Sequence, residues 1–135
     1  MQTQSFMVDV PGGQVFVQRW QPASATSGAA CPIVLLHESL GSVGQWHDFP
    51  ARLAQATGRE VLAYDRLGFG QSSPRSDAPC LQFIAHEAQQ HFPALVAALG
   101  LERYALLGHS VGAVMALHIA AAHPAQCQAV LSLSA

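Results

Sequence analysis

The feature that most constrains the fold is a set of four short, mainly apolar runs separated by stretches with helical spacing. The apolar runs are residues 32–36, 60–65, 104–107 and 129–133. Runs of this kind are typical of strands that are buried on both faces of a parallel sheet. The intervening helical stretches are residues 46–57, 81–99 and 111–122. Strands alternating with helices predict an α/β fold, with a mostly parallel sheet and helices on both of its faces.

The segment before the first run has a different pattern. Residues 6–10 and 15–20 flank a Pro-Gly-Gly turn, which predicts an antiparallel β-hairpin, and residues 22–30 read as a small polar loop. Glycines at positions 58 and 100 are predicted to end the first two helices. Pro93 lies inside the second helical stretch, where it should kink or divide the helix.

Composition narrows the class of protein. The chain has 135 residues, of which 50% are hydrophobic and 10% charged, so one domain with a substantial core is expected. A net charge of −2 disfavours a nucleic-acid partner, and no signal peptide or membrane span is evident. Three cysteines without a Cys-x-x-Cys pair are interpreted as free thiols in a reducing cytoplasm. No cluster has metal-ligand spacing, so neither a metal nor an organic cofactor is expected.

A Gly-His-Ser-Val-Gly sequence at residues 108–112 follows the third apolar run and opens the last helical stretch. Between a strand and a helix, a Gly-x-Ser-x-Gly pattern is typical of a nucleophile elbow, whose strained backbone lifts the serine Oγ above the sheet. Gly108 and Gly112 would remove side chains that collide with the adjacent strand and helix. We therefore predict that Ser110 is the catalytic nucleophile. The N–H of Val111, at the helix N-terminus, is placed to receive an oxyanion.

Two further loops follow strands of the predicted sheet. Residues 37–42 are His-Glu-Ser-Leu-Gly-Ser, and residues 65–72 are Asp-Arg-Leu-Gly-Phe-Gly-Gln-Ser. Together with the serine motif they have the order and spacing of the α/β-hydrolase superfamily. Over nearly its whole length the chain resembles the esterase, peptidase and C–C hydrolase branch of that superfamily. The resemblance implies the α/β-hydrolase fold and a serine hydrolase, and it specifies no substrate.

The resemblance also implies roles for the two loops. A second oxyanion N–H should come from the loop after the first apolar run, and by position this donor is Ser39. Glu38 occupies a position where many members have glycine, and if the loop geometry differs, Leu40 would supply the N–H instead. We interpret the remaining loop residues as structural supports of the site that act through hydrogen bonds or ion pairs; they are His37, Asp65 and Arg66.

The sequence lacks part of the expected machinery. A serine hydroxyl needs a histidine base oriented by a carboxylate, and in this fold both follow the serine. No Asp or Glu follows Ser110, and His118 and His123 lie too far along the helix to reach it. The side chain of His109 is expected to support the site and to point away from it. We therefore interpret residues 1–135 as one partial domain that ends after the strand following the nucleophile helix, with little turnover of its own.

Three functions remain open at this level. The first is a serine hydrolase acting on a small-molecule ester or related acyl bond. The second is an acyltransferase or cofactor-free haloperoxidase of the same fold, which would use the same serine. The third is a truncated, non-catalytic hydrolase homologue. The sequence does not constrain the oligomeric state.

Overall fold

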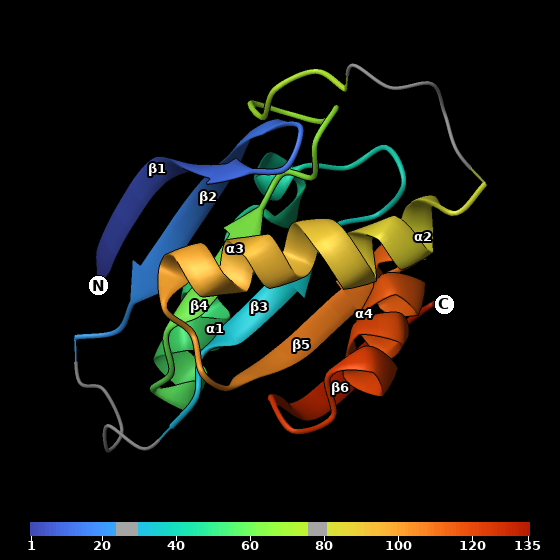
Figure 1. The fold of residues 1–135 in the computed structure, drawn as a ribbon. Coiled ribbons are helices and arrows are strands. Elements are labelled where there is room, and N and C mark those ends of the chain that lie inside the picture. Colours follow the sequence, from blue (N-terminus) through green and yellow to red (C-terminus); the bar gives the residue numbers. More distant parts are fainter. Residues whose placement is uncertain (24–29, 76–80) are drawn as a thin grey trace.

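The structure is a computed structural model, which describes residues 1–23, 30–75 and 81–135 (Figure 1). Its centre is one six-stranded mixed sheet with the strand order β1-β2-β4-β3-β5-β6. The strands are β1 (Gln2–Val10), β2 (Gly13–Gln21), β3 (Ile33–Leu36), β4 (Val61–Tyr64), β5 (Tyr104–His109) and β6 (Cys127–Leu133). Cys80 and most of the loop predicted at 22–30 lie outside the described residues.

The first two strands form the predicted antiparallel hairpin, which is longer than the sequence pattern indicated. Its register runs from Gln2 opposite Gln21 to Val10 opposite Gly13. Strand β2 then pairs antiparallel with β4. The remaining pairs, β4 with β3, β3 with β5 and β5 with β6, are parallel. The prediction of a mostly parallel sheet preceded by an antiparallel hairpin is confirmed.

The helix predicted for residues 46–57 is shorter than expected. A 3₁₀ turn, η1 (Val43–Trp46), comes first, and α1 (Phe49–Thr57) follows. His47 lies between them with a φ of 52°, which no helical residue adopts, and Pro50 stands in the first turn of α1, where proline is well tolerated. The C-terminal end was predicted correctly, because Gly58 caps α1 in the left-handed conformation.

The second helical stretch is divided, as Pro93 predicted. It consists of α2 (Phe83–His86), the π-helical turn η2 (Glu87–His91) and α3 (Phe92–Leu99). Proline has no N–H to donate to the preceding turn, so a regular α-helical ladder cannot pass through this position. The π-helical turn ends at His91, and Pro93 stands in the first turn of α3, where a missing N–H is well tolerated. Gly100 caps the C-terminal end of α3 with a φ of 68°.

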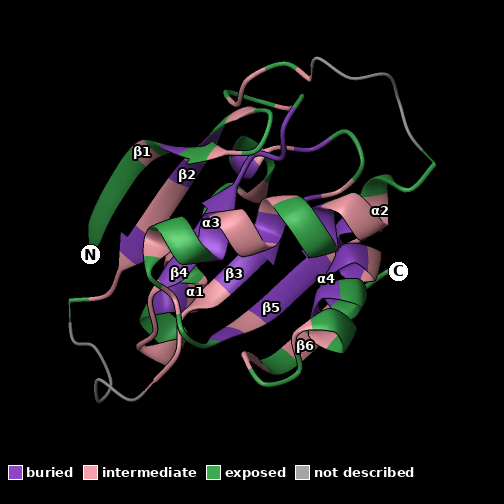
Figure 2. Ribbon diagram, in the orientation of Figure 1, coloured by how far each residue is buried: buried purple, intermediate pink, exposed green. Residues whose placement is uncertain are grey.

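The last helix, α4 (Val111–Ala122), has the predicted bounds. The helices form layers on the two sides of the sheet, because successive strand residues face opposite ways. In β4, Leu62 and Tyr64 pack into the core cluster that also holds side chains of α3 and α4. Val61 and Ala63, from the same strand, pack into a second cluster with side chains of α1. Figure 2 shows the central strands as the most buried part of the molecule, with exposed residues on β1 and β6.

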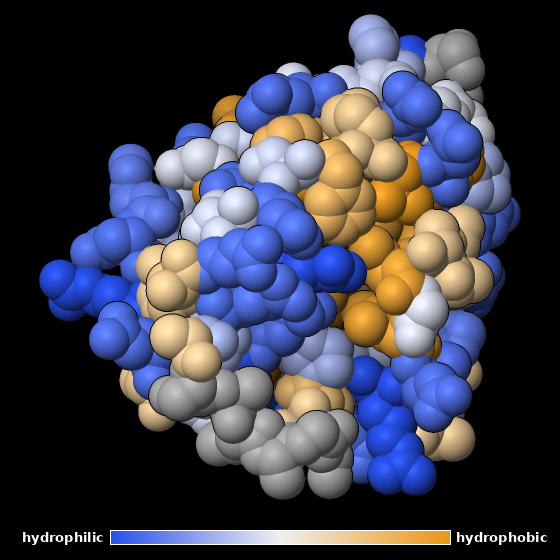
Figure 3. Space-filling view, turned by 90° about the vertical axis from the view of Figure 1, so that its left-hand side faces the viewer, coloured by the Kyte–Doolittle hydropathy of each residue, from blue (hydrophilic) through white to orange (hydrophobic). Residues whose placement is uncertain are grey.

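The rim of the larger core reaches the surface beside the hairpin. Phe6, Leu99 and Leu101 are partly buried against this core, and the guanidinium of Arg19 lies 5.3 Å from the Phe6 ring centroid. Figure 3 shows hydrophobic side chains gathered on this side of the molecule between hydrophilic ones. Among the described residues, no helix is both long enough and apolar enough to cross a bilayer.

The sheet brings the three loops of interest to one edge. Leu36, at the end of β3, pairs with Tyr64 at the end of β4 and with Gly108 near the end of β5. Parallel strands end at the same side of a sheet, which is where open α/β sheets bind their ligands. The loop after β3, the loop after β4 and the turn after β5 therefore meet at one site.

Candidate active site

Ser110 occupies the turn between β5 and α4 with a strained backbone. Its φ of 58° and ψ of −120° lie in a region that non-glycine residues rarely adopt. The Ser110 N–H donates to the carbonyl oxygen of Leu133 at 2.8 Å, and the Ser110 carbonyl accepts from the N–H of Ala113 at 2.9 Å. The strained conformation is thus held from β6 on one side and from α4 on the other.

The two glycines that flank the serine permit very close packing. A Cβ on Gly108 would collide with the backbone of Gly112 and Ala113, and a Cβ on Gly112 would collide with the carbonyl oxygens of Leu36 and His37. Both obstacles are backbone atoms, which cannot turn aside as a flexible side chain can. The requirement for glycine at both positions therefore follows from the close approach of β5, α4 and β3.

The oxyanion donors stay predictions, and the structure shows how each is placed. Val111 is the first residue of α4, and the first N–H groups of a helix have no acceptor within the helix. Ser39 is exposed in the loop after β3. The carbonyl of Glu38 accepts from the Gly41 N–H at 3.1 Å, from His37 Nδ1 at 2.7 Å and from Arg66 Nη2 at 3.0 Å. Because a trans peptide is planar, these three donors also fix the direction of the Ser39 N–H.

His37 is buried, and both of its ring nitrogens are engaged. Its Nε2 accepts from the backbone N–H of Arg66 at 3.0 Å, so Nδ1 carries the proton that is donated to the Glu38 carbonyl. Burial, and next the positive charge of Arg66, lower the pKa of His37 from 6.5 to about 4, although the hydrogen bond to Glu38 opposes this. At neutral pH the imidazole is therefore uncharged, and with both nitrogens occupied it has no free position for proton transfer to Ser110.

The loop after β4 is held by the residues expected to support it. The buried carboxylate of Asp65 accepts the N–H of Val43 at 2.6 Å and the N–H of Gln71 at 2.8 Å. The Arg66 guanidinium donates to the carbonyls of His37 and Glu38, and its carbon lies 4.9 Å from the Phe69 ring centroid. These hydrogen bonds join the loop after β4 to the loop after β3.

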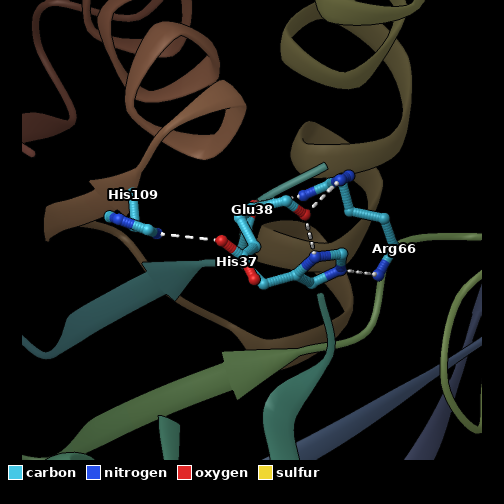
Figure 4. Close-up of polar contacts among 4 residues, drawn as sticks. All are labelled: His37, Glu38, Arg66 and His109. Atoms are coloured by element: carbon cyan, nitrogen blue, oxygen red, sulfur yellow. Dashed lines mark hydrogen bonds and ion pairs between the residues drawn. The ribbon is translucent and has the colours of Figure 1, made fainter. Parts of the chain in front are cut away.

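The expected orientation of His109 is wrong. Instead of pointing away from the site, the side chain of His109 approaches the loop after β3, and its Nδ1 lies 3.5 Å from Oε2 of Glu38 (Figure 4). Both side chains are about two-fifths exposed, at 43% and 41%. Alternation along β5 predicts the face on which a side chain lies but not this cross-loop contact, which depends on where the loop carries Glu38.

A cavity of about 280 Å³ opens beside this pair. Its lining comes from the loop after β3, from η1 and from the end of β5; the residues are His37, Glu38, Ser42, Gln45, Trp46 and His109. Sequence reasoning missed Ser42, Gln45 and Trp46. The one sequence signal that could have identified them is their position shortly after β3, because open α/β sheets bind ligands beyond the carboxyl ends of their strands.

A second missed feature is a buried acid, Glu87, at the start of η2. The hydroxyl of Tyr64 donates to Oε2 of Glu87 at 3.0 Å, and Glu87 is only 3% exposed. Burial raises the pKa of the Glu87 carboxyl, and burial together with the negative charge of Glu87 raises the pKa of Tyr64. Glu87 also lines a cavity of about 210 Å³ that includes Ser39 and Arg66.

The described residues do not bring a base to the serine. No hydrogen bond joins the Ser110 hydroxyl to a histidine in the described ranges. His118 is exposed on α4, and Nε2 of His123 lies 3.2 Å from the carbonyl of Ala88. No group of three or more metal-ligating side chains is found within the described part of the chain.

Known proteins are similar in sequence to this chain. The proline iminopeptidase of Lactobacillus delbrueckii subsp. lactis is 33% identical over 101 residues, which cover 73% of this chain and 34% of that enzyme. A 1-acylglycerol-3-phosphate O-acyltransferase of Pongo abelii is 37% identical over 100 residues, covering 70% of this chain and 27% of that protein. The chain therefore spans about a third of the length of these curated relatives.

Solved structures and a family model agree with these matches. The crystal structure of proline iminopeptidase from Mycobacterium smegmatis superposes with a TM-score of 0.78 at 32% identity, covering 94% of this chain and 42% of that one. The family model for the alpha/beta hydrolase fold matches residues 32–135, which include all three loops of the site. The chain belongs to the α/β-hydrolase fold family.

Proposed function

We propose that this chain carries the nucleophile and the oxyanion donors of a serine hydrolase that acts on a carboxylic ester or related acyl bond of a small molecule. The observation that carries the proposal is the backbone of Ser110, whose φ of 58° and ψ of −120° occur at a strand-to-helix turn closed by two glycines. A non-glycine residue adopts such a strained backbone where its side chain must project from the fold.

The proposed reaction has two stages. The Ser110 oxygen attacks the acyl carbonyl while its proton passes to an imidazole base supplied by a segment outside residues 1–135. The N–H groups of Ser39 and Val111 stabilise the tetrahedral oxyanion, and the leaving group departs with the proton. Water then attacks the acyl-serine in the same way and releases the acid.

A covalent probe tests the nucleophile directly. We expect fluorophosphonate labelling of the chain to be slow, because the described residues supply no base, but to lie at Ser110, so that the label is absent from Ser110→Ala and retained by Ser132→Ala. Peptide mass spectrometry locates the label. Modification of other serines with Ser110 untouched contradicts the proposed nucleophile.

An ester-hydrolysis assay tests whether residues 1–135 supply a base of their own. With a short-chain p-nitrophenyl ester, residues 1–135 alone should show little hydrolysis above that of Ser110→Ala. Robust hydrolysis that Ser110→Ala abolishes would mean that one of the chain's own histidines serves as the base.

An acyltransferase is the second candidate, favoured by the 37% identity to the acyltransferase relative. The same acyl-serine would then transfer its acyl group to an alcohol instead of water. Product analysis with an added alcohol acceptor separates the two, because transfer yields a new ester and hydrolysis yields the acid.

The proposed hydrolase is also placed in a reducing, cytoplasmic setting, in line with the free thiols of Cys31 and Cys127.

A further inference from the structure

Among the described residues, the cavity beside the His109–Glu38 pair is lined by one carboxylate and by no lysine or arginine. Glu38 supplies the carboxylate, and the neighbouring walls are formed by a serine hydroxyl, a glutamine amide, two imidazoles and an indole. Two of the lining residues, His109 and Glu38, are the chain neighbours of Ser110 and Ser39, so the cavity borders the loops that carry the proposed nucleophile and its oxyanion donor.

The basic groups around Glu38 leave its charge available. The Arg66 guanidinium is bound to the carbonyls of His37 and Glu38 and not to the Glu38 carboxylate (Figure 4). His37 is uncharged at neutral pH, because its pKa is lowered to about 4. His109, at 3.5 Å, contributes a positive charge only when it is protonated. The cavity is therefore a site of negative potential whenever His109 is neutral.

The aromatic wall is fixed in place. The Trp46 ring stacks on Phe49, with 5.8 Å between the ring centroids and 26° between the planes. An indole π-system beside a carboxylate is the combination that attracts organic ammonium ions, and tryptophan gives the strongest cation–π attraction. The cavity volume of about 280 Å³ suits a small headgroup.

We propose that this cavity is a subsite for an organic ammonium group, with Glu38 and Trp46 as its recognition residues. This rests on the proposed function, because it assigns to the hydrolase an acyl substrate with a positively charged group close to the bond that is cleaved. A neutral substrate of the same shape would offer no opposite charge to the Glu38 carboxylate.

Choline and its neutral isostere 3,3-dimethyl-1-butanol test the proposal by binding alone. Titration calorimetry on residues 1–135 at pH 8 should give a dissociation constant for choline about tenfold below that of the isostere. Of the two tryptophans, Trp20 is 7% exposed in the core, so a change in tryptophan fluorescence on choline addition should be lost in Trp46→Phe.

Three variants define the residues. Glu38→Gln should weaken choline binding about tenfold and leave the isostere unchanged, whereas Glu102→Gln, an exposed carboxylate elsewhere, should alter neither. In case Glu38→Gln disturbs the loop, Gln45→Glu adds a second carboxylate at an exposed position and should tighten choline binding about threefold.

The outcomes separate the subsite from the catalytic proposal. Ser110→Ala should bind choline as the unmodified chain does, so that recognition is measured without chemistry. Equal affinity for choline and the isostere, or choline binding that neither Glu38→Gln nor Gln45→Glu changes, overturns the subsite. If Ser110 is labelled by the fluorophosphonate while choline does not bind, the subsite alone is wrong.

Discussion

Strands β5 and β6 are parallel neighbours in one sheet, yet they differ in how firmly they are held. Strand β5 pairs with β3 and β6, and its Leu106 and Leu107 are 2% and 5% exposed. Strand β6 has β5 as its one strand partner among the described residues, and Leu131 and Leu133 are 53% and 40% exposed. The difference indicates that tolerance to substitution increases from the centre of the sheet toward β6, and that the proposed nucleophile, Ser110, lies at the boundary.

The largest effect is expected where three backbones meet. Gly112→Ala should lower the free energy of unfolding by about 4 kcal/mol or more, or prevent folding, because the new Cβ collides with the carbonyl oxygens of Leu36 and His37. Gly44→Ala is the matched control, since its Cβ would meet only Ser42 Oγ at an ordinary 3.6 Å, and it should change stability by no more than about 0.5 kcal/mol. Urea unfolding measures both, and equal costs would refute the close-packing argument.

The second prediction compares the two strands directly at paired positions. Leu107 and Leu131 are register partners on β5 and β6. Leu107→Ala should cost about 2–5 kcal/mol, because it empties a packed core position. Leu131→Ala should stay within about 0.5 kcal/mol, because half of that side chain is already in water. Thermal and urea unfolding of both variants test this, and similar losses would mean that β6 is packed as tightly as β5.

The third prediction concerns the pH dependence created by His37. Its pKa is about 4 in the folded chain and near 6.5 when unfolded, so the unfolded chain binds the proton first as pH falls. Stability should therefore decline between pH 6.5 and 4, by up to about 3 kcal/mol, and this contribution should level off below pH 4. The raised pKa of Glu87 acts in the opposite direction, since its protonation favours the folded chain.

A variant isolates the histidine contribution from that of Glu87. The stability difference between the unmodified chain and His37→Gln should shrink on going from pH 7 to pH 4.5, as measured by urea unfolding at each pH. A difference that stays constant over this range would mean that His37 titrates normally in the folded chain.

The smallest predicted loss of stability concerns the Asp65 carboxylate, which joins two loops. Asp65→Asn should cost about 1–3 kcal/mol, because the amide NH₂ would face the N–H of Val43 or of Gln71 and leave one donor unpaired. Asp48→Asn removes an exposed carboxylate paired with Arg52 and should cost less than about 1 kcal/mol. If the two variants lose equal stability, the Asp65 bridge contributes little.

Local signals predicted the parts of the fold that depend on nearby residues. The bounds of α4 and the glycine ends of α1 and α3 follow from short patterns, because a helix end is satisfied within a few residues. The start of α1 was misplaced, since the break at His47 belongs to the loop that carries Val43 to Asp65. That contact joins positions 22 residues apart, and no periodicity encodes it.

The candidate site divides in the same way. The serine motif could be recognised from sequence because its two glycines, which close packing around the serine requires, lie within the same five residues. The contact of His109 with Glu38 and the hydrogen bond of Tyr64 to Glu87 depend on tertiary distances instead. Glu38 was noted for replacing a common glycine, and the direction of its carboxylate became visible only with the loop in place.

The hydrogen bond from the Ser110 N–H to the Leu133 carbonyl couples the proposed nucleophile to the end of β6. Pairing of β6 with β5 and the final orientation of Ser110 should therefore be established together during folding. A probe that reacts with Ser110 would report on the docking of this strand as well as on chemistry. Any partner or chain segment that clamps the last residues of β6 would raise reactivity without touching a reacting atom.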